Sequence, residues 1–389
     1  MEGNGKSSTF EAFPAELQEY YRKLFGKEAE EIMASLRTPV EKYYIRVNTL
    51  KTSRDKLMRI LRREGLKPKR SPYLREGIYF EREGPNFPDD YEPGLKVVRA
   101  NKFASESVYQ GANLYAPGVL QADKSIRPGD EVEIRDPRGL LVGIGIAKMS
   151  AKEMIVSTRG LAVEVTTPKF KLPSLSELES FKEGLFYAQS LPSMVVAHVL
   201  EPSEEELIID MAAAPGGKTS HIAQLLQNRG EIIAIDKSRN RLRKMEEELK
   251  RLGVKNVRLI RMDARKLPEL GLQADKILLD APCTALGIRP KLWESRTPRD
   301  IVATARYQRA FIWAAIKSLR PGGVLVYSTC TLSYEENEAN VRFMLEKGLK
   351  LEEQAVFIGS EGIGLDNVQR FYPNRHLTQG FFIARLRKV

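Results

Sequence analysis

Cysteine, histidine and long hydrophobic runs are scarce in this chain of 389 residues, and each scarcity excludes a class of protein. The two cysteines, Cys283 and Cys330, cannot build a disulfide framework, and the three histidines are too far apart for a zinc motif, so we expect no metal. No apolar stretch approaches the ~20 residues that a membrane helix needs, and Met1–Phe10 lacks the apolar segment of a secretion signal. We therefore expect a cytoplasmic protein that does not bind membranes.

Acidic residues are also fewer than basic ones, with 51 Asp and Glu against 62 Lys and Arg and a net charge of +11. Such an excess favours a partner that carries phosphate, either a nucleic acid or an anionic membrane. The plain alternative is a basic surface that serves solubility alone. Because no lysine-rich amphipathic anchor is evident, the sequence favours nucleic acid as the partner.

The C-terminal part, residues 168–389, alternates short apolar strands with helices. Strands are predicted at Leu207–Asp210, Ile232–Ile235, Val257–Met262, Lys276–Leu279, Val324–Tyr327 and Phe381–Leu386. Short apolar strands separated by helices are typical of a parallel sheet that is buried on both faces. The pattern predicts a doubly wound, Rossmann-like α/β domain.

Two smaller modules are predicted before that domain. Residues 94–167 contain short strand candidates divided by turn signals, which is typical of a small β barrel. These candidates are Val97–Val98, Gly118–Leu120, Glu131–Ile134, Leu140–Ile146 and Met154–Ser157. Residues 1–93 mix helices, at Ala15–Phe25 and Ser53–Glu64, with strands, and we expect an α+β module there.

A glycine-rich loop, Asp210–Thr219, follows the first strand of the C-terminal domain and opens a helix. Glycines let the backbone approach a ligand closely, and a helix N-terminus offers free N–H groups. In one interpretation, Ala212–Thr219 departs by one residue from the loop of P-loop nucleoside triphosphatases, and Leu278–Asp280 holds their magnesium. In the other, the loop faces the amino-acid part of S-adenosylmethionine.

Three aspartates that follow successive strands favour the second interpretation. Asp210, Asp236 and Asp263 each come at or directly after a strand. An acid at the second strand end can hold ribose hydroxyls, and one at the third can contact adenine, whereas both would repel a triphosphate. A helix cap or a solvated turn would explain any one of them, but not all three in register. The sequence therefore predicts a site for S-adenosylmethionine.

The cysteines also follow strands, in Asp280-Ala-Pro-Cys283 and Ser328-Thr-Cys330. Ligands bind at the carboxyl ends of strands in such sheets, so Lys218, Asp280 and both cysteines should surround one crevice. Beside S-adenosylmethionine, a thiol suits methylation at cytosine C5, because a thiolate must first add to C6. A donor or acid near N3 stabilises the charge that develops there, and a base then removes the C5 proton. The residues alone do not decide which cysteine attacks.

Several stretches resemble the Sun-domain RNA cytosine-5 methyltransferases. They are Arg46–Asn48, Gly184–Ser193, Asp210–Thr219, Asp280–Cys283, Ser328–Cys330, Glu336–Glu338 and His376–Phe382. The resemblance implies that Cys330 is the nucleophile, that Cys283 assists release of the base, and that Asp280 and Lys218 lie near the target cytosine. It assigns S-adenosylmethionine to Asp236, Asp263, Asp280 and the loop residues Ala212, Ala213, Ala214, Pro215, Gly216, Gly217 and Lys218. Many members have cysteine where this chain has Ala212, a change that a backbone contact should tolerate.

The middle segment resembles a PUA domain, an RNA-binding β barrel, at Gly111–Gly118, Arg127–Ile134 and Gly139–Gly145. A Sun-domain enzyme with a PUA domain is similar to the subgroup that methylates cytosine 72 in the tRNA acceptor stem, where the barrel engages the 3′ CCA end. The resemblance therefore implies tRNA as the partner, and we expect a monomer. Ribosomal RNA as the substrate, or an RNA-binding protein without activity, are the alternatives.

A few other residues carry weaker expectations. Lys102, Arg127 and Arg138 are candidate phosphate contacts, although exposed basic residues are usually only solvated. We expect His198 and His221 to pack on helices and His376 to make a structural hydrogen bond. Trp293 should be a packing residue or lie near RNA.

Overall fold

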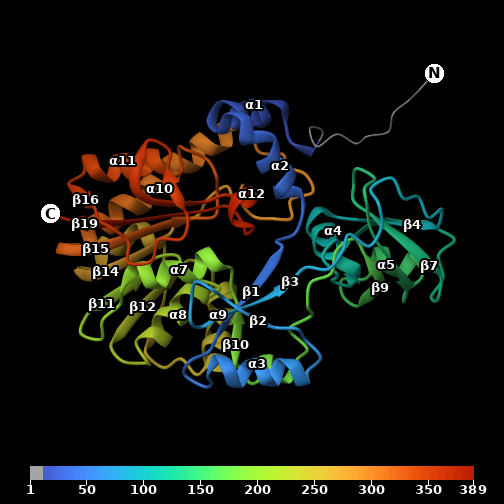
Figure 1. The fold of residues 1–389 in the computed structure, drawn as a ribbon, viewed down its shortest axis with the longest axis horizontal. Coiled ribbons are helices and arrows are strands. Elements are labelled where there is room, and N and C mark those ends of the chain that lie inside the picture. Colours follow the sequence, from blue (N-terminus) through green and yellow to red (C-terminus); the bar gives the residue numbers. More distant parts are fainter. Residues whose placement is uncertain (1–11) are drawn as a thin grey trace.

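The computed structural model describes residues 12–389, so the segment on which the expectation about secretion rests, Met1–Phe10, lies outside the described residues. Figure 1 shows a large layered α/β body with a small barrel beside it, and the N-terminal helices lie against the large body. Within residues 12–389, no helix is both long enough and apolar enough to cross a membrane.

A nine-stranded sheet lies at the centre of the large body, in the order β13-β12-β11-β14-β15-β19-β18-β17, with β16 paired to β19. The strands from β13 to β15 run parallel, whereas β19 is antiparallel to β15. The bounds are β11 Leu207–Asp210, β12 Glu231–Asp236, β13 Val257–Arg261, β14 Ala274–Asp280, β15 Leu319–Thr329, β16 Leu349–Leu351, β17 Ser360–Gly362, β18 Leu365–Phe371 and β19 Phe381–Lys388. The chain order changes direction at β11, so the carboxyl ends of β11, β12 and β14 meet at one edge.

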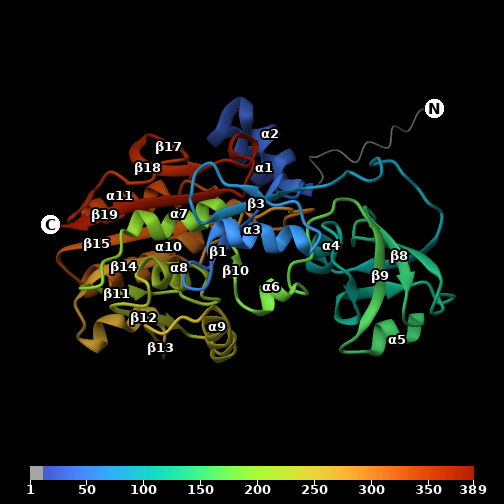
Figure 2. The same cartoon turned by 60° about the horizontal axis from the view of Figure 1, so that its bottom comes forward.

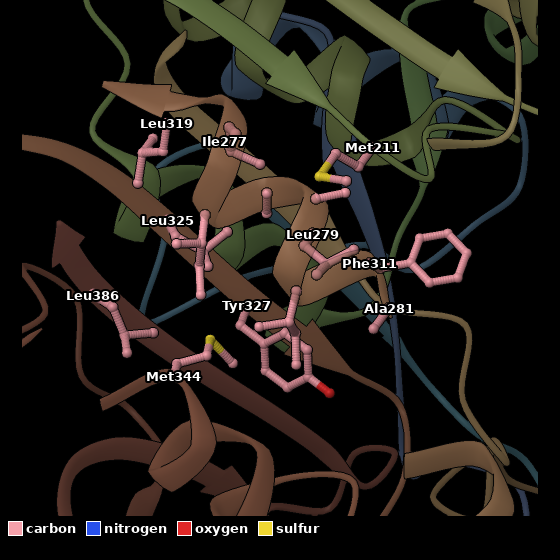
Figure 3. Close-up of a cluster of buried hydrophobic side chains, with 14 of the residues drawn as sticks. Met211, Ile277, Leu279, Ala281, Phe311, Leu319, Leu325, Tyr327, Met344 and Leu386 are labelled. Carbon is pink, nitrogen blue, oxygen red and sulfur yellow. The ribbon is translucent and has the colours of Figure 1, made fainter. Parts of the chain in front are cut away.

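Helices cover both faces of this sheet (Figure 2). They are α7 Leu191–Leu200, α8 Gly217–Leu225, α9 Arg239–Leu252, α10 Pro298–Ser318, α11 Glu338–Glu346 and the short α12 Pro373–His376, with a 3-10 segment at Ala264–Leu270. Because side chains alternate along a strand, Ile208 packs in one hydrophobic cluster with α7 and α8, and Ile209 packs in the other. Figure 3 shows that second cluster, in which Phe311 of α10 lies near Leu279 of β14. The predicted doubly wound α/β domain is confirmed.

The barrel has a six-stranded sheet in the order β5-β9-β8-β7-β4-β6. Its elements are β4 Lys96–Ala100, α4 Lys102–Val108, β5 Leu114–Tyr115, β6 Val119–Ala122, β7 Glu131–Arg135, β8 Leu141–Ala147, α5 Ala151–Val156 and β9 Leu161–Pro168. Neighbouring strands are antiparallel except for β4 and β7. Its apolar side chains form a core of their own, which includes Val98, Val132, Val142 and Val163.

One strand candidate in the barrel is wrong, because Met154–Ser157 lies mostly in helix α5. Ser150 accepts a hydrogen bond from the backbone N–H of Glu153, and the Glu153 carboxylate accepts one from the N–H of Ser150. This reciprocal capping box starts a helix and outweighs the β-branched residues that follow it. The sequence prediction also overlooked β9, which pairs with β8 along most of its length.

The N-terminal module is built on a third sheet, in the order β10-β1-β3-β2. Its elements are α1 Ala15–Phe25, α2 Ala29–Arg37, β1 Lys42–Val47, α3 Arg54–Arg63, β2 Lys69–Arg70, β3 Gly77–Glu81, α6 Glu179–Lys182 and β10 Phe186–Ala188. Helix α3 covers one face of this sheet with Leu57, Met58 and Leu61. Because β10 follows the barrel in the chain, the barrel is inserted within this module.

Helices α1 and α2 leave their own sheet and pack on the large body. Leu17, Tyr21 and Leu36 share a hydrophobic cluster with Ile301 and Leu332 of the C-terminal domain. The N-terminal module is therefore anchored to the central domain by apolar burial, and its β10 strand is held at the edge where the carboxyl ends of the central strands meet.

Candidate active site

The two cysteines meet beyond the carboxyl ends of β14 and β15, where their Sγ atoms are 3.3 Å apart. Both side chains are partly exposed. The hydrogen bond to Cys330, together with burial, raises the pKa of the Cys283 thiol well above its ordinary value. Two adjacent thiols do not ionise together, so one thiol of the pair keeps its proton and can donate it to the sulfur of the other. Their positions differ in one respect, because Cys330 lines the cavity described below and Cys283 does not.

A buried hydrogen-bond network holds the two cysteine loops together. Each cysteine is followed by a threonine, and the Oγ1 atoms of Thr284 and Thr331 are 2.8 Å apart. The carboxylate of Glu336 accepts from the Thr284 N–H at 2.8 Å and from the Thr284 hydroxyl at 2.5 Å. Burial raises the pKa of Glu336. The carboxyl group of Glu336 therefore sets the spacing of the thiols without touching either one.

The two residues after Glu336 support the Cys330 loop from beneath. The Thr329 hydroxyl donates to Asn337 Oδ1 at 2.6 Å, and Asn337 Nδ2 donates to the carbonyl of Thr331 at 3.2 Å. Glu338 forms a buried ion pair with Arg370, which also donates to the carbonyl of Leu332 at 2.8 Å. The stretch Glu336–Glu338 is therefore a scaffold for the nucleophile loop.

Lys218 and Asp280 form an ion pair beside the thiols, with Lys218 Nζ 2.6 Å from Asp280 Oδ2. The Ser328 hydroxyl donates to the other oxygen of Asp280 at 2.7 Å. Burial opposes the charge on Lys218, but the nearby Asp280 carboxylate outweighs it, so the pKa of Lys218 is raised. The ammonium group also lies 5.4 Å from the centre of the Phe381 ring. A charged lysine and a carboxylate therefore stand together near Cys330.

The glycine loop is shaped by close contacts that admit no side chain at two positions. Gly216 has a φ of +101°, and a Cβ there would lie 2.9 Å from Met245 Cγ. A Cβ on Gly217 would come 2.9 Å from the ring of Tyr187. The first turn of α8, which begins at Gly217, leaves N–H groups without helical acceptors. The loop can therefore bring backbone donors close to a ligand.

Asp210, at the end of β11, is buried beneath this loop. Its carboxylate accepts hydrogen bonds from the Thr219 hydroxyl at 2.7 Å and from the Ala212 N–H at 3.3 Å. Burial raises the pKa of Asp210 to about 6. A buried carboxylate at this position favours a cationic ligand in the adjacent cavity.

A cavity of about 280 Å³ lies between the loop, β10 and Cys330. Among the residues predicted for the site, it is lined by Ala212, Ala213, Ala214, Pro215, Gly217, Lys218, Asp280 and Cys330. The cavity is also lined by Asp210, which the aspartate pattern included without a contact role, and by residues that the prediction missed: Tyr187, Ala188, Gln189, Ser190, Ser193, Ile288, Gln379 and Phe381. Most of these lie in stretches that resemble the family, but only Asp210 has a side chain whose chemistry suggests a role.

Gly216, Cys283, Asp236 and Asp263 were also predicted for the site but are not among the residues that line this cavity. Asp236 is buried at the end of β12 and is paired with Arg241, whose guanidinium also donates to the carbonyl of Ala214 in the loop. Asp263 follows β13 and binds Arg265, and this hydrogen bond lowers the pKa of Asp263 to about 2. The structure therefore brings Asp236 to the glycine loop and leaves Asp263 farther along the same sheet edge.

The arrangement fits S-adenosylmethionine better than a nucleoside triphosphate. The lysine and threonine that would bind phosphate and magnesium in a P-loop are engaged by Asp280 and Asp210. Carboxylates would repel a triphosphate, whereas they attract the positively charged sulfonium of S-adenosylmethionine. In that case the loop would hold the amino-acid part, and Asp236 the ribose.

A buried arginine of the N-terminal module contacts the glycine loop and the start of α8. Arg46 of β1 donates to the carbonyl of Gly217 at 2.6 Å, to the Ser220 hydroxyl at 2.7 Å, and to Gln189. Burial lowers the pKa of Arg46 to about 9. Asn48, two residues on, donates to the carbonyl of Leu252 at 2.7 Å. The Arg46–Asn48 stretch therefore attaches the N-terminal sheet to the start of α8 and the end of α9.

Two histidines converge on one acid beneath this junction. His198 Nε2 lies 2.6 Å, and His221 Nε2 3.0 Å, from Glu76 Oε1. Burial, together with the nearby charge of Arg46, lowers the pKa of His221 to about 3. These three side chains could offer ligand atoms, but the Nε2–H groups already satisfy the carboxylate, and the charge of Arg46 opposes a cation. We interpret the cluster as a structural link, in keeping with the packing role expected for these histidines.

The candidate phosphate contacts of the barrel have mixed surroundings. Lys102 Nζ lies 4.7 Å, and the guanidinium carbon of Arg138 4.9 Å, from the centre of the Trp293 ring. Trp293 packs with the barrel core, so it joins the barrel to the loop after Cys283. Arg127 is exposed and donates to the carbonyl of Lys124 at 3.3 Å. Lys102 is half-buried, its ammonium lies 4.0 Å from the buried Glu294 carboxylate, and burial lowers its pKa.

A doubly wound sheet whose strand ends carry this loop and this thiol pair places the chain among the Rossmann-like methyltransferases. Family models agree: 16S rRNA methyltransferase RsmB/F matches residues 197–387, the PUA domain matches 96–168, and the ferredoxin-like domain of RsmF/B-like methyltransferases matches 13–86. The chain is 77% identical over 380 residues to the tRNA (cytosine(72)-C(5))-methyltransferase of Pyrococcus horikoshii, covering 97% of this chain and 98% of that protein. The chain belongs to the RsmB/F-type Sun-domain methyltransferases that carry a PUA domain.

Further relatives agree with this assignment. Human tRNA (cytosine(72)-C(5))-methyltransferase NSUN6 is 34% identical over 308 residues, covering 69% of this chain and 65% of that protein. The crystal structure of NSun6 from Pyrococcus horikoshii with SFG superposes with a TM-score of 0.95 at 76% identity, covering 98% of this chain and 99% of that one. The predicted family, its three-part architecture and its class of enzyme are confirmed by these comparisons.

Proposed function

We propose that this enzyme transfers a methyl group from S-adenosylmethionine to C5 of cytosine 72 in the acceptor stem of tRNA. The observation that carries the proposal is the thiol pair, 3.3 Å apart, beside the Lys218–Asp280 ion pair in a chain 77% identical to a tRNA cytosine-72 methyltransferase. Cytosine C5 is a poor nucleophile and needs a thiol adduct at C6, whereas methylation of an exocyclic oxygen or nitrogen needs none.

In the proposed reaction Cys330 is the nucleophile. Cys330 lines the cavity, and a hydrogen bond from the Cys283 thiol, whose sulfur is 3.3 Å away, would stabilise the Cys330 thiolate. Attack of the Cys330 thiolate forms a bond from Sγ to C6 of the base and moves an electron pair towards C5 and N3. The bound cofactor supplies the methyl group that C5 then takes.

Cys283 acts in the second half of the reaction. While Cys330 carries charge, the pKa of Cys283 is held high by its neighbour. Once Cys330 Sγ is bonded to carbon that charge is gone, so Cys283 ionises more readily and can accept the proton from C5. Loss of this proton lets the electron pair expel Cys330 as a thiolate and restores the aromatic base.

Lys218 and Asp280 would orient the base and exchange a proton with it. The ion pair leaves a charged ammonium and a carboxylate near Cys330, where they can bind the polar edge of cytosine around N3 and its amino group. Ser328 holds the carboxylate in position through its second oxygen. This is the electrostatic stabilisation that the developing charge at N3 requires.

The cofactor would be held by the loop residues 212–218, Asp236, Asp263 and Asp280. A solved relative bound to SFG, an analogue of S-adenosylmethionine, supports this assignment. Asp236 would exchange Arg241 for the ribose hydroxyls, and Asp263 would reach the adenine edge. The PUA barrel would engage the CCA end, and the enzyme would act as a monomer in the cytoplasm.

The test is a methyl-transfer assay with tritiated S-adenosylmethionine. The purified protein is given intact tRNA, tRNA that lacks its CCA end, and ribosomal RNA, and the labelled nucleoside is identified. Labelled 5-methylcytidine at position 72 of intact tRNA, lost on trimming, is the expected result. Label in ribosomal RNA alone would overturn the substrate assignment, and no label in any RNA despite cofactor binding would overturn the activity.

A further inference from the structure

The positive charge of the chain is concentrated in one short segment of the N-terminal module. Residues 51–75 contain ten Lys and Arg and two acidic residues, a net charge of +8 out of +11 for the whole chain. This segment includes helix α3 and strand β2. Figure 1 shows α3 at an outer edge of the molecule, below β1 and β10.

Five of these cations form what we call the α3 basic face: Lys56, Arg59, Arg62, Arg63 and Lys67. All five are exposed. In the part of the chain that the structure describes, their side chains make no ion pair or hydrogen bond, unlike Lys69 and Arg70 nearby, which pair with Glu81 and Asp55. The charge of this face is therefore not compensated within the protein.

The spacing of these cations works against the helix that carries them. Lys56, Arg62 and Arg63 lie three or four residues from Arg59, and like charges at this spacing destabilise a helix. A surface kept basic for solubility would interleave acids, as α9 does with Glu246, Glu247 and Glu248. An unfavourable charge cluster indicates a partner that neutralises it.

From this we infer that the α3 basic face binds phosphates of the RNA duplex whose cytosine enters the active site. This inference rests on the proposed function. Helix α3, which carries this face, belongs to the same module as the sheet that borders the active-site cavity. Ala188 of β10 lines that cavity, and β10 pairs with β1. Helix α3 packs directly on this sheet, so only the thickness of one helix, about 10 Å, separates the face from the strands that border the cavity.

An anionic membrane fits this face less well than RNA. Helices that lie on membranes bury an apolar side in the lipid, but the apolar residues of α3, Leu57, Met58 and Leu61, are buried against the N-terminal sheet. The exposed side therefore offers charge alone, as expected for contacts with a phosphate backbone.

The experiment uses the full chain with three neutral substitutions, R59Q/R62Q/R63Q. A control variant, R239Q/R243Q/K250Q, removes the same charge from exposed positions of α9. We measure the tRNA dissociation constant over a range of salt, the methylation rate at saturating tRNA, cofactor affinity and thermal stability. In the α3 variant we expect affinity at least tenfold weaker, a salt slope smaller by about two to three, an unchanged rate at saturation and a melting temperature that is equal or higher.

The outcomes separate this inference from the proposed function. If the wild-type chain methylates tRNA and the α3 variant binds it as tightly as the α9 control, the α3 basic face is not an RNA site. If the α3 variant instead loses binding to vesicles that contain anionic phospholipid, and keeps its tRNA affinity, the partner is a membrane and the inference is wrong. A wild-type chain that neither binds nor methylates tRNA would contradict the proposed function itself.

Discussion

The two thiols at the centre of the site have different proposed roles, so removing each one should block a different step. Removal of Cys330 Sγ in Cys330→Ala removes the atom that bonds to C6, so we expect methyl transfer to fall by at least about 10³-fold. The loop that would hold the cofactor is untouched, and calorimetry should find the same affinity for S-adenosylmethionine. Normal turnover in this variant would show that Cys330 is not the nucleophile.

Cys283→Ala should fail at a later step. The nucleophile remains, but the group that accepts the C5 proton is gone, so the covalent complex between Cys330 and RNA should persist. A denaturing gel of the variant with tRNA and S-adenosylmethionine should show a slower band that the double variant Cys283→Ala/Cys330→Ala lacks. If no such band forms and product is released normally, Cys283 has no part in release.

At this scale the sequence was most informative where chemistry restricts the residue type. A thiol, a lysine or a carboxylate at a strand end suggests its own role, so Cys283, Cys330, Lys218 and Asp280 could be predicted before any geometry was known. Gln379 could not be predicted in this way, although its amide donates a hydrogen bond of 2.9 Å to the Ser190 hydroxyl in the cavity wall. Amides and hydroxyls occur throughout a protein surface, and only the fold shows which ones face a cavity.

Among the elements, the turn from β11 into α8 tolerates the least change. In Gly216→Ala, the new Cβ would lie 2.9 Å from Met245 and the backbone would keep a φ that favours glycine. Strain of this kind costs about 1–3 kcal/mol, which should appear as a lower melting temperature and at least tenfold weaker binding of S-adenosylmethionine. Gly271→Ala is the control, since its φ is also positive but its Cβ position is open. Equal losses in both would show that backbone strain alone, and not the loop, is responsible.

Helices and strands were predicted correctly where a hydrophobic pattern extends over many residues. The prediction failed where a short local motif determines the secondary structure. The parallel strands and the long helices of the C-terminal domain follow their apolar patterns closely. Helix α5 was predicted as a strand because Ile155 and Val156 favour strands, yet the Ser150–Glu153 capping box determined the local structure. That error concerns Met154–Ser157 alone, and it leaves the architecture unchanged.

At the scale of the whole molecule, the junction between the N-terminal module and the central domain should make stability depend on pH. Within the fold, burial keeps His221 neutral, with a pKa of about 3. Burial acts to raise the pKa of Glu76, but the hydrogen bonds from His198 and His221 outweigh it, so the pKa of Glu76 is lowered. The unfolded chain therefore binds more protons than the folded one below the ordinary histidine pKa of 6.5. Stability is then complete near neutral pH and falls as the pH decreases from about 6.5, by up to about 1.4 kcal/mol per pH unit for one group.

Chemical denaturation at pH 7, 6 and 5 would measure this slope. The variant His221→Gln keeps an amide donor for Glu76 but has no titratable ring, so its slope between pH 6.5 and 5 should be smaller by roughly the contribution of one group. An identical slope in the variant and the wild type would show that His221 does not govern the acid sensitivity.

This junction also shows which features of the whole chain can be predicted from the sequence and which cannot. The division into an α+β module, a barrel and a doubly wound domain followed from patterns within short windows. The contacts of Glu76 with His198 and His221, and of Arg46 with Gly217, join residues more than a hundred positions apart. No local pattern encodes such pairs, because their spacing depends on how complete modules pack against each other.

The segment that leads into the barrel and the segment that leads out of it lie side by side and are hydrogen-bonded to each other. Glu83 and Lys171 exchange backbone hydrogen bonds of 3.0 Å, with the whole barrel between them in the chain. An ancestor without the barrel could have joined these two positions by a short turn and kept the strands on either side. The barrel could therefore be gained or lost in evolution as a single block, and a methyltransferase core could acquire a new RNA target without redesign of its catalytic centre.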